Sequence, residues 1–131
     1  TNTDLVSNLD FAQTFLDIAG ARQPGDMQGL ALTPLLRGKT PANWRKTHYY
    51  HYYEAGGHGV PVHYGVTDGR HKLIRFPDDT LDAWEFFDLK KDPNEMQSRY
   101  DDPQYTRTIA ALKEELNRLR KQYQVDNFEN P

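Results

Sequence analysis

The length, composition and charge of this chain exclude several classes of protein. Its 131 residues suit one domain with a modest core, and a net charge of -3 without any basic block argues against a nucleic-acid partner. The chain has no cysteine for a disulfide or thiolate site, no apolar run approaching the roughly 20 residues of a membrane span, and no signal-peptide pattern in its first residues.

The first predicted element is a helix over residues 10–19. Apolar residues recur there at helical spacing, Asp10 is placed to cap the helix, and Gly20 is placed to end it. A Gly- and Pro-rich connection follows to about residue 45, with one short helix expected near residues 34–36. Such a long connection is unusual inside an independent domain. It indicates that residues 1–45 belong to a larger body.

From Thr47 the hydrophobic period changes from helical spacing to two. Four aromatic and β-branched runs are separated by Gly, Pro and Asp: THYYHYYE, VHYGVTD, RHKLIRF and DAWEFFDL. They predict a four-stranded antiparallel sheet, in which Asp68 and Gly69 form the tight turn between the second and third strands. In the first strand Tyr49 and Tyr50 point to opposite faces, so some of its tyrosines pack inward and the others stay open to solvent or to a neighbour.

The last predicted element is a helix of about 19 residues between Tyr105 and Tyr123, where apolar residues recur at steps of four and three. Fewer than three heptads favour packing on the sheet over a coiled coil. The fold class is therefore α+β, a four-stranded antiparallel sheet packed with a C-terminal helix. Trp44 and Trp84 are interpreted as packing residues.

Histidine and tyrosine are concentrated in one stretch, although the sequence contains no complete catalytic set. Four of five histidines and five of eight tyrosines lie between residues 48 and 66, and phosphate-loop, GxSxG and HExxH motifs are missing. His51, His58 and His63 are able to converge beside a Gly-rich loop. Tyrosines beside histidines suit sugar binding, because the ring gives apolar contact and the hydroxyl a hydrogen bond. Ordinary surface or packed histidines remain the alternative.

Four motifs carry a resemblance to a known family. In chain order they are SNLDFAQTFLDIAG, QGLALTPLLRG, YGVTDGRHKLI and WEFFDLKKDPNE. Together they resemble the C-terminal part of the type I, formylglycine-dependent sulfatases, and bacterial sulfatases similar to N-acetylglucosamine-6-sulfatase in particular. The resemblance covers essentially the whole chain. It implies a sulfuric ester hydrolase acting on glycosaminoglycan or mucin-type sugars, at the periplasm or cell surface of a bacterium.

The resemblance also implies a division of the chain. Residues 1–45 would be the end of a large α/β sulfatase domain and the crossing segment, and residues 46–131 a C-terminal subdomain that packs on that N-terminal sulfatase domain. If separated from it, the first helix is expected to expose apolar residues, and the chain to self-associate or to leave residues 1–45 loosely packed. The residues expected to be exposed are Leu9, Phe11, Phe15 and Leu16.

The catalytic groups of the family have no counterpart in this chain. In the family the nucleophile is a formylglycine made from Cys or Ser in a Cys/Ser-x-Pro-x-Arg motif, and calcium holds the sulfate. This chain has no Cys and no Ser followed two residues later by Pro. No catalytic residue or metal ligand is therefore assigned, and the chain alone is expected to be inactive.

Substrate contact is the role that the resemblance implies for this chain. It points to His58 and His63 as residues that reach a sugar hydroxyl, with His51 and Glu54 as second candidates. Two other interpretations stay open, a non-catalytic carbohydrate-binding module and a structural cap.

Overall fold

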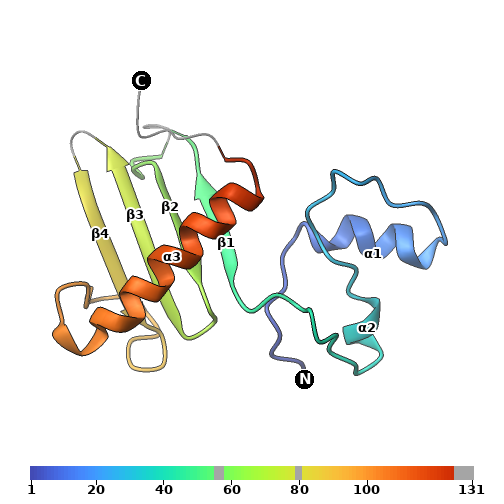
Figure 1. Cartoon of the computed structure of the whole chain (residues 1–131), viewed down its shortest axis with the longest axis horizontal. Coiled ribbons are helices and arrows are strands. Elements are labelled where there is room, and N and C mark those ends of the chain that lie inside the picture. The colour runs from blue at the N-terminus through green and yellow to red at the C-terminus, as the bar shows by residue number, and fades with distance from the viewer. Residues whose placement is uncertain (55–57, 79–80, 126–131) are drawn as a thin grey trace. The chain divides into compact units, whose positions relative to one another are not determined.

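The chain forms two compact units, Thr1–Lys46 and Thr47–Pro131, in the computed structural model shown in Figure 1. The structure describes residues 1–54, 58–78 and 81–125. None of the helices formed by these residues is long and apolar enough to cross a membrane.

The first unit contains two helices, α1 (Asp10–Ile18) and α2 (Thr33–Leu36), both at their predicted places. Gly20, at a φ of 63°, follows the end of α1 in the left-handed conformation. The backbone N–H of Ala21 then donates to the carbonyl of Leu16 at 2.9 Å, as in the common glycine-terminated helix end. Gly20 therefore ends the helix as predicted.

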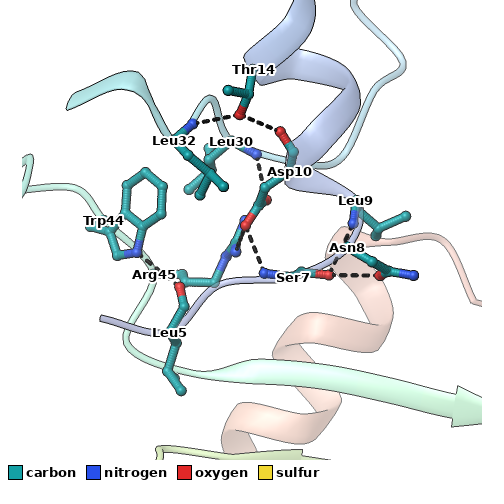
Figure 2. A network of polar contacts seen from close by, with 10 residues as sticks. All are labelled: Leu5, Ser7, Asn8, Leu9, Asp10, Thr14, Leu30, Leu32, Trp44 and Arg45. Carbon is teal, nitrogen blue, oxygen red and sulfur yellow. Dashed lines mark hydrogen bonds and ion pairs between the residues drawn. The ribbon is translucent and has the colours of Figure 1, made fainter. Parts of the chain in front are cut away.

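Asp10 organises the first unit through a buried ion pair (Figure 2). Both oxygens of its fully buried carboxylate accept hydrogen bonds of 2.5 Å from the guanidinium of Arg45. They also accept the backbone N–H groups of Ser7, at 2.7 Å, and Leu30, at 2.8 Å. Burial raises the pKa of this carboxyl, but the hydrogen bonds outweigh burial, so the pKa lies below its ordinary value. The prediction that Asp10 caps α1 is wrong, because Leu9 occupies the cap position and the Asp10 carboxylate binds groups outside the helix.

The amphipathic pattern of α1 is turned outward within this unit. Its polar residues Gln13 and Thr14 are buried, as is Asp10. Large apolar residues at i, i+4 and i+7 form an apolar stripe on the exposed side: Phe11 (55% exposed), Phe15 (67%) and Ile18 (67%). The expected exposure of the apolar face is confirmed, including Leu9, whereas Leu16 is half-buried.

The second unit is the predicted antiparallel sheet with a helix. Its elements are β1 (His48–Tyr52), β2 (His63–Thr67), β3 (His71–Asp78), β4 (Leu81–Asp88), the 3-10 turn η1 (Pro103–Tyr105) and α3 (Thr106–Gln122). The strands lie in the order β1-β2-β3-β4, so each pairs with its neighbour in sequence. Figure 1 shows α3 lying diagonally across one face of this sheet. The predicted α+β fold class is confirmed.

Strand alternation gives the sheet a covered face, which packs against α3, and an open face on the other side. The core on the covered face consists of Tyr64, Val66, Leu73, Phe86, Tyr105, Ile109, Leu112, Leu116 and Leu119. Trp84 packs against this core, with its ring stacked on Tyr100. In the first unit Trp44 is 5% exposed and donates through Nε1 to the carbonyl of Leu5 at 2.9 Å. Both tryptophans are therefore packing residues, as predicted.

The hairpin between β2 and β3 turns at the predicted Asp-Gly pair. Gly69 has a φ of 87°, a conformation that glycine adopts without steric cost. The carboxylate of Asp68 accepts the backbone N–H groups of Arg70, at 2.8 Å, and His71, at 2.6 Å. These bonds satisfy the backbone of the turn and help to set the strand register.

Candidate functional site

The candidate site is a row of three rings on the open face, one from each of β1, β2 and β3. This aromatic row consists of Tyr52, His63 and Phe76. Tyr52 and His63 are cross-strand partners, and their rings stack with centroids 5.5 Å apart and planes 18° apart. The ring of Phe76 lies 5.5 Å from that of His63 on the next strand. All three residues are half-buried, so the row supports itself and still presents surface to solvent.

Tyr50 and Gly65 form the floor beside the aromatic row. They face each other in the β1–β2 register. The Tyr50 ring lies over the glycine so closely that a Cβ on Gly65 would be 2.6 Å from the Tyr50 hydroxyl and 2.4 Å from the carbonyl oxygen of Leu73. The same ring meets His63 edge-on at 5.9 Å. Burial raises the pKa of Tyr50, so its phenol stays protonated.

His51 lies on the covered face, away from the aromatic row. Its ring stacks on Tyr53 with centroids 3.6 Å apart, and its Nδ1 shares a hydrogen bond of 2.8 Å with the hydroxyl of Tyr49. Burial raises the pKa of that Tyr49 hydroxyl to about 12. Burial, followed by the charges of Arg120 and His63, lowers the pKa of His51. His51 is therefore placed to hold Tyr53 in position as a neutral ring.

Glu54 and His58 lie beside the end of β1 and are both exposed. The carboxylate oxygen of Glu54 is 3.9 Å from Nε2 of His58, and the two side chains are 60% and 76% exposed. Glu54 also accepts a long hydrogen bond of 3.4 Å from the hydroxyl of Tyr52. Burial and then the charge of Glu54 raise the pKa of Tyr52. The acidic side chain is thus connected to the aromatic row.

The structure brings some of the residues chosen from the sequence together and separates others. Glu54 and His58 lie next to each other, His63 is linked to Glu54 through Tyr52, and His51 is on the other face of the sheet. The three histidines do not converge, and no group of three or more His, Cys, Asp or Glu in the described part of the chain could hold a metal ion. Strand alternation, once the register is known, adds Tyr52 and Phe76 to the site.

A pocket of about 450 Å³ lies at the opposite end of the second unit, after β4 and around η1. The charged residue Asp88 in its lining is only 2% exposed. Its carboxylate accepts a hydrogen bond of 3.1 Å from the guanidinium of Arg70 and another of 3.1 Å from the hydroxyl of Tyr105. The bond from Arg70 is the main reason that the pKa of Asp88 lies well below its ordinary value. Lys91 donates to the same Tyr105 hydroxyl at 2.7 Å. Because these groups bind one another, we interpret the pocket as structural.

A known protein family matches nearly the whole chain. The family described as N-sulphoglucosamine sulphohydrolase, C-terminal, matches residues 1–122. The chain belongs to this family. The sulfatase resemblance of the four sequence motifs is thereby confirmed, together with its position at the C-terminal end of the enzymes.

Two relatives and one solved structure show how the chain relates to whole enzymes. It is 45% identical, over 94% of its length, to an N-acetylglucosamine-6-O-sulfatase of Bacteroides thetaiotaomicron. It is 32% identical, over 78% of its length, to a Delta 4,5-hexuronate-2-O-sulfatase of the same organism. A structure of BT4656 in complex with its substrate D-glucosamine-2-N,6-O-disulfate superimposes on 92% of the chain with a TM-score of 0.86 and 44% identity. The chain spans only 22%, 21% and 25% of these three proteins.

Proposed function

We propose that this chain is the C-terminal part of a sulfatase that removes sulfate esters from glycans, of the N-acetylglucosamine-6-O-sulfatase type, and that residues 46–131 form its substrate-lining subdomain. The observation that carries the proposal is the 45% identity to such an enzyme over 94% of the chain. The similarity to BT4656, which was solved with a sulfated glucosamine, supports the same class of substrate. A sulfated saccharide is thus the proposed ligand of the parent enzyme.

The catalytic groups are proposed to lie in the N-terminal sulfatase domain of that parent. Cleavage of a sulfate ester needs an activated nucleophile and positive charge against the departing sulfate. The residues of this chain do not fit either calcium or a formylglycine. The sequence has no Cys and no Ser followed two residues later by Pro, and the described part has no cluster suited to a metal. This chain would then contribute substrate contacts, while both catalytic groups belong to the other domain.

Substrate contact is assigned to the end of the sheet that carries the aromatic row. His63 and His58 present ring nitrogens there, and Glu54 adds a carboxylate within reach of hydroxyl groups. Exposed polar groups beside an aromatic surface are the usual composition of a sugar-binding surface. His51 supports this end from the covered face through its stacking on Tyr53.

The apolar stripe of α1 is proposed to pack against the rest of the large sulfatase domain, to which residues 1–45 would belong. Phe11, Phe15 and Ile18 expose more than half of their surface on one side of one helix, and such a contiguous apolar surface marks an interface. The proposed occupant is that domain because the relatives are four to five times longer than the matched segment. The polar network under α1 would hold the helix in the orientation that this contact needs.

Sulfate release by the full-length parent tests the proposed function. The parent, produced together with its maturation enzyme, is incubated with 6-O-, 2-O- and N-sulfated saccharides, and this chain alone is the control. We expect release by the parent from a 6-O-sulfated glucosamine and none by the chain alone. A parent that carries the Cys/Ser-x-Pro-x-Arg motif and releases sulfate from no saccharide would overturn the proposal.

A further inference from the structure

Two of the four sequence motifs are joined by an ion pair. Lys72 belongs to the motif YGVTDGRHKLI and Glu95 to the motif WEFFDLKKDPNE. The ammonium of Lys72 donates to the carboxylate of Glu95 at 2.6 Å, although the two residues are 23 positions apart in sequence. Their side chains are 25% and 33% exposed, so water screens the pair only in part. The pair therefore fastens the turn that follows β4 to strand β3.

The backbone places Glu95 for this contact at a steric cost. Glu95 has a φ of 55°, in the left-handed region that residues other than glycine seldom adopt. Asp92 fixes the turn around it, because its carbonyl accepts the N–H of Glu95 at 3.2 Å and its carboxylate accepts the N–H of Gln97 at 2.9 Å. A strained residue persists only where its surroundings hold it. Here the strained turn delivers a carboxylate to Lys72.

The ion pair holds Lys72 over the ring of Tyr50. The Lys72 ammonium lies 5.5 Å from the centroid of that ring, within the range of a cation–π contact. The hydroxyl of Tyr50 is buried and has no hydrogen-bond partner in the part of the chain that the structure describes. The ring is therefore held by its packing on Gly65 and by its contact with Lys72, and not through its hydroxyl.

Tyr50 connects the ion pair to the end of the sheet that carries the aromatic row. Its ring meets the ring of His63 edge-on, with centroids 5.9 Å apart. Burial, followed by the charges of Glu95 and Glu85, raises the pKa of Tyr50, so the carboxylate of the pair also acts on this ring. A single ring thus links the ion pair to His63.

From this arrangement we infer that Lys72 and Glu95 are positioning residues for substrate binding. Their ion pair holds the ring of Tyr50, and this ring keeps His63 in place at the end of the sheet to which substrate contact is assigned. The inference rests on the proposed function and adds to it two residues that act through another side chain. It gives the two motifs a common role.

Steady-state kinetics of the full-length parent on its sulfated saccharide test the inference. Lys72→Met and Glu95→Gln each remove one charge of the pair and keep much of the side chain. We expect each to raise KM about two- to tenfold with kcat nearly unchanged, because a contact made equally in the ground state and the transition state is weakened. A variant that is merely less stable would instead lower kcat through loss of active enzyme and leave KM unchanged.

Further variants test whether the pair acts through the ring of Tyr50. Tyr50→Phe removes only the hydroxyl without a partner and is expected to keep the wild-type KM. Tyr50→Leu removes the ring and is expected to raise KM as Lys72→Met does, and the two combined should cost no more than either alone. Lys72→Arg keeps a cation for the ring and for Glu95 and is expected to stay close to wild type. Arg118→Met, which breaks an ion pair with Glu115 on α3, is the matched control and is expected to change neither constant.

The outcomes separate this inference from the proposed function. If the KM of Lys72→Met and Glu95→Gln stays at the wild-type value, whether or not kcat falls, the pair only stabilises the fold. The inference is then wrong, while the sulfatase assignment stands. Losses in Lys72→Met and Tyr50→Leu that multiply in the combined variant would also overturn it, because the two residues would then act independently. If the parent releases sulfate from no saccharide, the proposed function fails, and the inference fails with it.

Discussion

Gly65 matters for the side chain that it lacks. A Cβ at this position would lie 2.4 Å from a backbone oxygen of Leu73 and 2.6 Å from the hydroxyl of Tyr50. The backbone oxygen cannot rotate away, so the strands themselves would have to separate. The close approach of Tyr50 therefore depends on glycine at this one position in β2.

Gly65→Ala is expected to destabilise the second unit by about 1–3 kcal/mol, the usual cost of overpacking. Urea unfolding of the chain followed by circular dichroism measures the change. Gly25→Ala is the control, because nothing lies within 4 Å of its Cβ position, and it is expected to stay within about 0.5 kcal/mol of wild type. Equal stability of the two variants would contradict the packing argument.

Asp88 is expected to make the second unit sensitive to acid. Its hydrogen bond from Arg70 is the main cause of a pKa held below the ordinary value of 3.8. Because the pKa of Asp88 is lower in the folded than in the unfolded chain, its ionised carboxylate stabilises the fold fully above about pH 3.8. This stabilisation is lost as the pH falls through the lower pKa of the folded state.

Asp88→Asn is therefore expected to unfold more easily at neutral pH and to lose less additional stability on acidification than the wild type. Urea midpoints measured across the acid range check both parts. Asp101→Asn, an exposed residue just before η1, serves as the control and is expected to keep the wild-type change of urea midpoint with pH. If the urea midpoint of Asp88→Asn falls with pH as steeply as that of the wild type, other carboxylates dominate the loss of stability in acid.

At the scale of elements, α1 buries its polar side within the first unit and exposes its apolar side. Its polar residues bind the connection that follows the helix, and Phe11, Phe15 and Ile18 are left exposed on the other side. Exposed aromatic and aliphatic side chains in water favour association. The apolar stripe should therefore dominate the solution behaviour of this chain.

We expect this chain to self-associate and the triple variant Phe11→Gln, Phe15→Gln, Ile18→Gln to be monomeric in size-exclusion chromatography with light scattering. Met96→Gln, which alters an 81% exposed side chain of the second unit, is the control and is expected to associate like the wild type. In the full-length parent the triple variant should lower the melting temperature. A monomeric wild-type chain whose first unit is fully protected in hydrogen exchange would contradict this expectation.

The elements were predictable because their patterns are local. Alternation identified all four strands, and the steps of four and three identified the buried face of α3. The role of Asp10 was not predictable, because its partner Arg45 lies 35 positions away in sequence and the path of the connection decides which charges meet. In the same way, the separation of His51 from His63 follows from the β1–β2 register, which depends on contacts such as that between Tyr50 and Gly65.

At the scale of the whole molecule, the chain is proposed to contribute one part of an enzyme's function. It covers about a fifth to a quarter of its relatives' length, and the proposed division places bond cleavage elsewhere and substrate selection here. A scaffold of this kind needs no reactive group of its own. What it needs is a rigid sheet that presents side chains at one end, and the packed rings of Tyr52, His63 and Phe76 lie at such an end.

The position of the segment between Tyr52 and His63 has a consequence for how members of this family diverge. The segment joins two paired strands, and their alignment is set by contacts below it, including Tyr50 over Gly65. Insertions and deletions in it therefore leave every side chain of the sheet on its own face. Under the proposed function, a change in the length of this one loop would alter the sugar that is preferred, while the sequence requirements of the folded core stay the same.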